Sequence, residues 1–217
     1  GGGPAGATAA TVLAQAGLRV VLLEKEHFPR FHIGESLMTE TYWVFERIGM
    51  LDRLKASDFP RKHSVQFYSA SGKPSRPFYF QEHNPHESAV TWQVERSEFD
   101  RMMLENAAEN GTDVRTGTKV ERVLFDRSED AGKTTWPEGR FVGVEGKDAG
   151  GQAFRIHANV LVDATGLGAL LSRQLGITRK DPKLDKAAIY AHFVGAHRDP
   201  GIDEGATLII NTRENSG

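Results

Sequence analysis

Two long stretches of the chain follow the helical period, and each is followed by a glycine. Residues Pro4–Ala16 are small and apolar, and Gly17 comes next. Residues Glu95–Asn110 carry four apolar side chains on one helical face, and Gly111 follows them. Because glycine commonly stands just after the last turn of a helix, the pattern predicts two helices with these limits. Shorter helical patterns cover residues 37–47 and 51–55.

Short apolar runs between turn residues predict strands. Leu18–Leu23 and Asn159–Asp163 have the continuous apolar character of strands that are buried on both faces. Further strands are expected at Val65–Tyr68, Pro77–Phe80, Asp113–Thr116, Lys119–Phe125, Arg140–Val144, Phe154–His157, Ala187–Val194 and Ala206–Ile210. Residues 126–138 are polar and rich in turn formers, which predicts an exposed connection.

Composition excludes several classes of protein. The 217 residues are 39% hydrophobic and 26% charged with a net charge of −2, which is typical of a globular domain and unlike a basic nucleic-acid-binding face. The chain has no cysteine, so it has neither disulfides nor thiolate metal sites. The eight histidines have no spacing that favours a metal site. No apolar run reaches the ~18 residues of a membrane span, and we expect a cytoplasmic protein.

The opening motif points to a dinucleotide. Gly1, Gly3 and Gly6 fit the G-x-G-x-x-G pattern, in which glycines permit a tight turn and close approach of the backbone to a pyrophosphate. The helix that follows offers unpaired N–H groups to the phosphates. Glu24 stands at the end of the next predicted strand, where a carboxylate can bind ribose hydroxyls; the alternative is a solvated charge. An acid there favours FAD or NAD over NADP.

A family resemblance decides between these cofactors. Five segments together resemble the FAD-binding half of the flavoprotein monooxygenase superfamily: Gly1–Gly6, Glu24, Phe28–Leu37, Trp92–Arg101 and Val162–Gly166. Within that superfamily, Phe28–Leu37 is similar to the flavin-dependent halogenase branch and to some related reductases. The resemblance spans nearly the whole chain, and it implies that FAD is the cofactor.

The motifs and the resemblance together give the expected cofactor contacts: Gly1, Gly3, Pro4, Ala5, Gly6, Glu24, Lys25, Gly34, Glu35, Ser36, Arg96, Asp163 and Gly166. Three of them have a structural alternative. Ser36 is also suited to cap a helix, Arg96 to pair with Asp100 on a helix surface, and Asp163 to lie in an ordinary strand–turn–helix connection.

Lys62 is the candidate catalytic residue. The segment Asp58–His63 resembles the one that supplies the active-site lysine of halogenases, and the resemblance implies that this lysine holds hypohalous acid, or a chloramine, for delivery to the substrate. A lysine suits this task because its ammonium is a compact donor whose pKa falls readily on burial. Without the resemblance, Lys62 would be one loop lysine among many.

The expected fold is α/β: a Rossmann-like FAD-binding domain, with its first strand missing, interrupted by strands of a β-rich substrate domain. The predicted division assigns residues 1–60 and 93–182 to the FAD-binding domain, and residues 61–92 and 183–217 to the substrate domain. The chain opens directly on the glycine motif and ends at Asn215–Gly217 without a closing element, so we expect a fragment that is inactive and binds FAD poorly alone.

The expected function is halogenation of an electron-rich small molecule with reduced FAD, oxygen and halide, the reduced flavin coming from a separate flavin reductase. Alternatives are an FAD-dependent hydroxylase, a geranylgeranyl-reductase-like enzyme, or a non-catalytic protein that binds FAD or a lipid. The halogenase hallmark Trp-x-Trp-x-Ile-Pro does not occur in these residues, and in the family it would follow Gly217.

Overall fold

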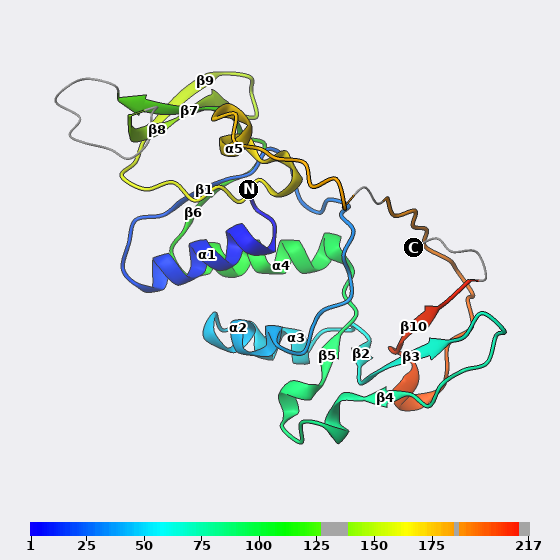
Figure 1. The fold of residues 1–217 in the computed structure, drawn as a ribbon. Helices are drawn as coiled ribbons and strands as arrows, with labels where there is room; N and C mark the ends of the chain where they lie inside the picture. The colour runs from blue at the N-terminus through cyan, green and yellow to red at the C-terminus, as the bar shows by residue number, and fades with distance from the viewer. Residues whose placement is uncertain (127–138, 185–186, 213–217) are drawn as a thin grey trace. The chain divides into compact units, whose positions relative to one another are not determined.

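The computed structural model describes residues 1–126, 139–184 and 187–212. The chain divides into two compact units, each built from two segments distant in sequence (Figure 1). The first unit comprises Gly1–Arg30 and Asp100–Ile189, and the second comprises Phe31–Phe99 and Tyr190–Gly217. The predicted connection at residues 126–138 lies, apart from Asp126, outside the described residues.

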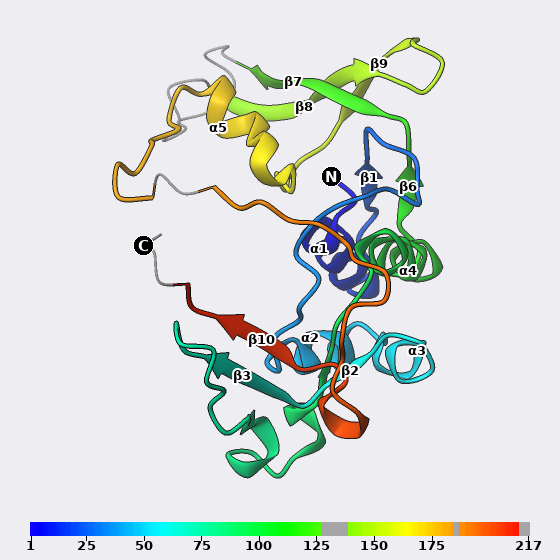
Figure 2. The same ribbon diagram turned by 90° about the vertical axis from the view of Figure 1, so that its right-hand side faces the viewer.

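The first unit contains the predicted α/β arrangement. Its elements are α1 (Pro4–Gln15), β1 (Val21–Leu23), the larger part of α4 (Arg96–Glu109), β6 (Asp113–Arg115), β7 (Lys119–Asp126), β8 (Arg140–Lys147), β9 (Ala153–His157), η4 (Gly166–Gly168) and α5 (Leu170–Gln174). Strands β1 and β6 pair in parallel, and α1 and α4 lie side by side against them in both ribbon views (Figure 2). Ala10, Leu22, Leu104 and Ala107 form the buried cluster between these elements.

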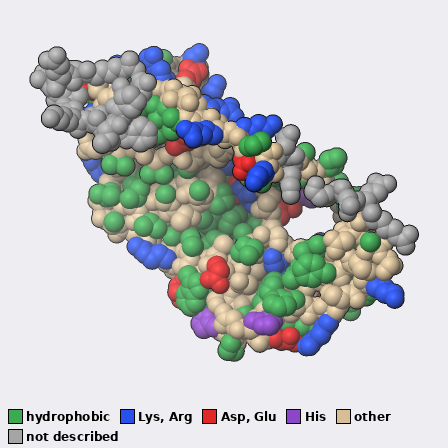
Figure 3. All heavy atoms as spheres, in the orientation of Figure 1, with side chains coloured by type: hydrophobic (Ala, Val, Ile, Leu, Met, Phe, Trp, Pro, Cys, Tyr) green, Lys and Arg blue, Asp and Glu red, His purple; other side chains and the backbone are tan. Residues whose placement is uncertain are grey.

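The helix limits follow from the sequence. Pro4 occupies the first turn of α1, where its missing N–H breaks no hydrogen bond. Gly17 and Gly111 follow α1 and α4 with φ angles of 79° and 97°, a left-handed conformation that glycine adopts without a steric penalty. Hydrophobic side chains, many of them alanines, cover much of the surface over α1 (Figure 3).

The rest of the first unit is an antiparallel sheet in the order β7-β8-β9. Helix α5 packs on β7 through Gln174, whose side chain accepts a hydrogen bond from Val123 N (2.8 Å) and donates one to Val123 O (2.7 Å). This pair of bonds ties the segment that follows Gly166 to the sheet.

The second unit contains two short helices and small sheets. Its elements are α2 (Thr41–Arg47), α3 (Leu51–Lys55), β2 (Arg61–Lys62), β3 (Ser64–Tyr68), β4 (Phe78–Tyr79), η1 (Phe80–Glu82), η2 (Glu87–Ala89), β5 (Thr91–Trp92), η5 (Gly201–Asp203) and β10 (Thr207–Ile210). Its buried apolar side chains include Tyr42, Phe45, Ile48, Met50, Leu54, Trp92 and Phe99. Strand β2 pairs antiparallel with β5, and β3 lies between β10 and β4.

Three strand predictions need correction. Residues 159–163 and 187–194 form no strand in the described chain, and their apolar side chains are exposed, Val160 by 77% and Val194 by 105%. Leu18–Leu23 is a strand only over Val21–Leu23, and Leu22 alone in it is fully buried. An apolar run predicts burial only if a neighbouring strand pairs with it, and no described strand pairs with residues 159–163 or 187–194.

The compact units divide the chain at Arg30, Phe99 and Ile189, which differs from the predicted division into an FAD-binding and a substrate domain. That functional division stays a prediction. Among the described residues, every helix is too short or too polar to cross a lipid bilayer.

Candidate cofactor-binding loop and lysine site

The residues Gly1–Gly6, here called the glycine loop, turn tightly at the start of α1. Gly3 is the extended residue before the helix, no side chain caps the helix, and the first turn, which contains Pro4 and Ala5, has no acidic residue. The first N–H groups of a helix have no partner within it, so this end carries a partial positive charge. A Cβ on Gly6 would lie 1.8 Å from Gly1 O, so the turn requires glycine at this position. A pyrophosphate fits such a loop.

Gly1 packs against the segment that contains the predicted second adenosine contact. A Cβ on Gly1 would lie 2.2 Å from Ala164 O, so the two backbones touch. The Asp163 carboxylate accepts hydrogen bonds from Thr165 N (3.0 Å), Thr165 Oγ1 (2.6 Å) and Leu171 N (2.9 Å). Burial opposes ionisation, but these hydrogen bonds prevail and lower the pKa of Asp163. Asp163 therefore holds its own turn, and Gly166 (φ 57°) lies within that turn.

Glu24 lies at the end of β1 and is 5% exposed. Its carboxylate accepts hydrogen bonds from Gly2 N (2.7 Å) and Glu26 N (2.9 Å), so it contacts the glycine loop directly. The neighbouring Lys25 is 64% exposed and pairs with Glu26 at 3.5 Å. The structure therefore brings Glu24 to the loop, and it leaves the side chain of Lys25 in solvent.

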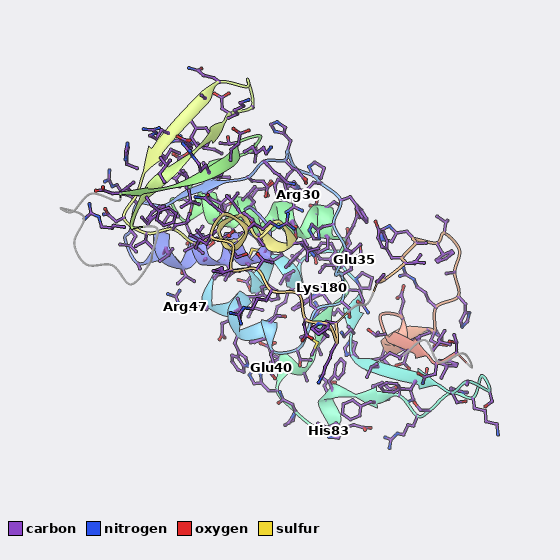
Figure 4. All side chains as sticks on the ribbon, turned by 45° about the horizontal axis from the view of Figure 1, so that its top comes forward. Arg30, Glu35, Glu40, Arg47, His83 and Lys180 are labelled. Carbon is purple, nitrogen blue, oxygen red and sulfur yellow. The ribbon has the colours of Figure 1, made fainter. Side chains whose placement is uncertain are left out.

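Arg30 is a residue of this cluster that the sequence did not reveal (Figure 4). Its side chain is 11% exposed, and its Nη2 lies 3.4 Å from Asp100 Oδ2 and 3.9 Å from Glu24 Oε2. The Asp100 side chain is fully buried. A Cβ on Gly3 would lie 3.4 Å from the same Nη2, so the guanidinium borders the glycine loop. The sequence signal for Arg30 was the proline-arginine pair in Phe28–Leu37. That pair does not reveal the partner of Arg30, because Asp100 is distant in the chain.

In the second unit, the segment Gly34–Ser36 is extended. Ser36 pairs with Gln93 in an antiparallel bridge, while Val94 N donates to Glu35 O (2.7 Å) and Leu37 N donates to Trp92 O (3.1 Å). Helix α2 begins only at Thr41, so the expectation that Ser36 caps a helix is wrong. Residues 35–37 pair with residues 92–94 and therefore do not form the start of a helix.

Arg96 holds this segment from the start of α4. Its Nη1 donates to Ile33 O (2.5 Å) and to Gly34 O (3.3 Å). Gly34 has a φ of 95°, and a Cβ on it would lie 3.2 Å from the Arg96 Nη1. Glu35 lies beside His192, with 3.2 Å between Oε1 and Nε2. Arg96 and Glu35 thus have local partners in the chain.

Lys62 lies on β2 and is 6% exposed. Its Nζ donates to Ser36 Oγ (2.7 Å) and to Leu37 O (2.8 Å), and it lies 5.8 Å from the centre of the Phe80 ring. Burial lowers the pKa of Lys62. These four residues are called the lysine site below. The sequence prediction named Lys62 and Ser36 for separate reasons, and the structure brings them into direct contact.

Comparisons with known proteins identify the family. A protein family described as "FAD binding domain" matches residues 1–215. The chain belongs to this FAD-binding domain family. The α/β fold class and FAD, both predicted from the sequence, are confirmed.

Several proteins similar to this FAD-binding domain are halogenases. The chain is 33% identical over 209 residues to the 1H-pyrrole-2-carbonyl-[peptidyl-carrier protein] chlorinase of Pseudomonas fluorescens, covering 89% of this chain and 44% of the relative. The structure of the myxobacterial chondrochloren halogenase CndH is similar with a TM-score of 0.63 and 37% identity, covering 73% of this chain and 34% of that one.

A triple mutant of the flavin-dependent brominase Bmp2 is similar with a TM-score of 0.73 and 31% identity, covering 96% of this chain and 48% of that one. The chain therefore spans less than half the length of these relatives. The predicted resemblance to the flavin-dependent halogenase branch is confirmed.

Proposed function

We propose that this FAD-binding domain belongs to a flavin-dependent halogenase, which uses reduced FAD, oxygen and a halide ion to halogenate an electron-rich organic substrate. The observation that carries the proposal is the buried Lys62 amine, hydrogen-bonded to Ser36 of the segment that resembles halogenases. The halogenases among the relatives support it. When bound, reduced FAD would supply the electrons that activate oxygen, and the activated oxygen would oxidise the halide.

The first unit is proposed to bind the adenosine diphosphate part of FAD. The unpaired N–H groups at the start of α1, in the turn containing Pro4 and Ala5, meet the pyrophosphate. Glu24 binds the adenosine ribose. Each of its carboxylate oxygens already accepts one backbone N–H, and a carboxylate offers about four acceptor positions, so capacity for ribose hydroxyls remains.

The remaining predicted cofactor contacts, Gly166, Asp163 and Lys25, differ in the way in which they could contact FAD. Gly166 is proposed to meet the cofactor through its backbone, because it lies in the turn next to Gly1. Asp163 supports that turn through its three hydrogen bonds, and its direct contact stays a prediction. The side chain of Lys25 is in solvent, so a contact from Lys25 would come from its backbone.

The second unit is proposed to bind the flavin end and to carry the chemistry. Gly34, Glu35 and Ser36 present backbone to the flavin, and Arg96 fixes their conformation through the carbonyl groups that it binds. Lys62 holds the oxidised halogen by a hydrogen bond or as a chloramine and delivers it to the substrate. Because burial favours the neutral amine, Lys62 is suited to exchange a proton at Nζ while it holds this species.

Halide and a separate flavin reductase are the proposed partners. The described chain contains a single glycine loop of the dinucleotide type, and it is already assigned to FAD. Reduced flavin would be supplied by diffusion from the reductase, as the resemblance to halogenases implies.

The decisive test is an assay of the intact protein with FAD, a flavin reductase, oxygen, and chloride or bromide. We expect Lys62→Ala to reduce halogenated product by about 100-fold or more, because a positioned acid–base group typically contributes this factor. FAD affinity is expected to be unchanged. Lys73→Ala, an exposed lysine in the second unit, is the matched control.

Three results would contradict the proposal, the first its lysine role and the other two the halogenase function. Halogenation by Lys62→Ala at the wild-type rate would remove the lysine role. A wild-type protein that only hydroxylates or reduces its substrate would be one of the alternative flavoenzymes, and one that consumes no oxygen with reduced flavin would be a binding protein.

A further inference from the structure

The Lys62 amine is the first member of a chain of side-chain hydrogen bonds within the second unit. Lys62 Nζ donates to Ser36 Oγ (2.7 Å), and Ser36 Oγ lies 3.3 Å from Thr207 Oγ1. Thr207 Oγ1 accepts a hydrogen bond from Gln93 Nε2 (3.0 Å). These contacts join β2, the Gly34–Ser36 segment, β10 and the residue after β5, which are distant in sequence.

The far end of this chain returns to the strand that carries Lys62. Gln93 Nε2 also donates to Gly205 O (3.1 Å), and Gln93 N donates to Pro60 O (2.9 Å). A Cβ on Gly205 would lie 2.1 Å from Arg61 O, so Gly205 packs directly on the backbone of β2. The hydrogen bonds therefore form a loop that begins at Lys62 and returns to Pro60, two residues before it.

The chemistry of the members decides what this loop can do. Both protons of the Gln93 amide nitrogen are committed, one to Thr207 and one to Gly205. An amide nitrogen has no acceptor position, so a proton from Lys62 cannot leave through Gln93. The network can hold the amine and its acceptor in place, but it cannot pass a proton on through Gln93.

We propose that Ser36, Thr207 and Gln93 are positioning residues that hold the Lys62 amine in its reactive orientation. The catalytic role of these three residues rests on the halogenase function proposed above, whereas the hydrogen bonds that they form do not depend on it. Ser36 acts directly as an acceptor from Nζ, and Thr207 and Gln93 act through Ser36. The same loop restricts Lys62 in the absence of cofactor, since every member belongs to the protein chain.

The carboxylate that packs against β2 has partners other than Lys62. Asp203 on η5, which packs against β2, accepts hydrogen bonds from Ser64 Oγ (3.1 Å) and Tyr79 OH (2.8 Å). The remaining ionisable side chains on the elements around β2 are Glu35, Arg61, His63, Glu82, Glu87 and Glu204. The acceptors of Lys62 Nζ, Ser36 Oγ and Leu37 O, are neutral. Removal of the Ser36 hydroxyl should therefore change the protonation of Lys62 measurably.

The test is an NMR titration of the Lys62 Cε resonance in the intact protein, assigned with Lys62→Met. Ser36→Ala removes an acceptor that stabilises the ammonium, so the titration midpoint moves to lower pH. Thr207→Val moves it in the same direction by less, and Ser36→Thr restores it. Thr91→Val is the matched control, because its hydroxyl is buried beside Lys62 on β5 but bonds to Met38 O instead. It should leave the midpoint unchanged.

Activity gives a second readout. With the halogenation assay, Ser36→Ala should lower kcat by about 10-fold to 100-fold, as expected when a reacting group is misplaced. Equal midpoints in Ser36→Ala, Thr91→Val and the wild type, in variants that melt like the wild type, would overturn the network. Shifted midpoints in a protein that does not halogenate would leave the network standing and remove the proposed function instead.

Discussion

The glycine loop in the first unit and the lysine site in the second unit are held by opposite kinds of contact. Around the loop, charges are paired: Glu24 binds backbone N–H groups, and Arg30 lies between Glu24 and the buried Asp100. In the lysine site, the Lys62 amine meets a hydroxyl and a backbone carbonyl. Paired charges fix the protonation state of a group, whereas neutral partners leave it adjustable.

The difference corresponds to two tasks. A loop that binds pyrophosphate needs a rigid backbone, and its charged side chains serve that backbone by holding it. The proton exchange proposed for Lys62 is favoured by a lowered pKa, and burial beside neutral acceptors lowers the pKa of this lysine. The following predictions test each side of this contrast.

The largest effect is expected at the glycine loop. In Gly6→Ala, the new Cβ would be placed 1.8 Å from Gly1 O, so the loop must move. Overpacking of this kind costs about 3 kcal/mol, which corresponds to about 100-fold weaker FAD binding if the cost falls on the bound geometry. A flavin fluorescence titration measures the change in FAD affinity. Gly168→Ala is the control, because its Cβ would lie 3.5 Å from its nearest neighbour. Similar FAD affinity in both variants would contradict the role of the loop.

The second effect concerns the paired charges. Arg30→Gln removes the guanidinium that lies 3.4 Å from the buried Asp100 carboxylate, and the loss of one partner of a buried pair typically costs about 3 kcal/mol. Arg76→Gln removes a 77% exposed partner of Glu82 and should cost about 1 kcal/mol or less. Urea denaturation of the intact protein compares the two free energies of unfolding. Equal losses would mean that the Arg30 cluster is no more important than a surface ion pair.

The smallest effect is the pH dependence of the lysine site. Burial lowers the pKa of Lys62 below its ordinary value of 10.5, so the unfolded chain binds more protons than the folded chain between these two pKa values. Stability from this group therefore rises with pH through that window and levels off above 10.5. Lys62→Met lacks the titration. As pH rises, the free energy of unfolding of the wild type should increase relative to that of Lys62→Met. For Lys73→Met, the free energy of unfolding should follow the same pH dependence as that of the wild type.

Much of the fold could be predicted from the sequence where the signal is local. The limits of α1 and α4 follow from their glycines, and the strands β7, β8 and β9 follow from short apolar runs between turns. The strand expected at residues 187–194 was wrong because a strand depends on a neighbour, which no local pattern reports.

The site was predictable to the extent that each residue belongs to a motif. Glu24 follows a strand at the spacing of the dinucleotide motif, and Lys62 was named through a family resemblance. Arg30 and Gln93 lie in segments of the family resemblance that gave them no role, and Thr207 lies in none. The roles of all three arise from contacts with residues far away in the chain. Such contacts become visible only when the chain is folded.

The parallel pairing of β3 with β10 has a consequence for synthesis of the protein. At the end of this strand pair, Asn211 Nδ2 donates to Tyr68 O, and 143 residues separate the two in sequence. Strand β3 therefore emerges from the ribosome long before β10. Contacts between residues so far apart slow folding, and an unpaired strand edge invites association with other chains. Because Thr207 lies on β10, the hydrogen bonds that link Ser36 to Thr207 and Gln93 cannot form until this late strand has joined the sheet.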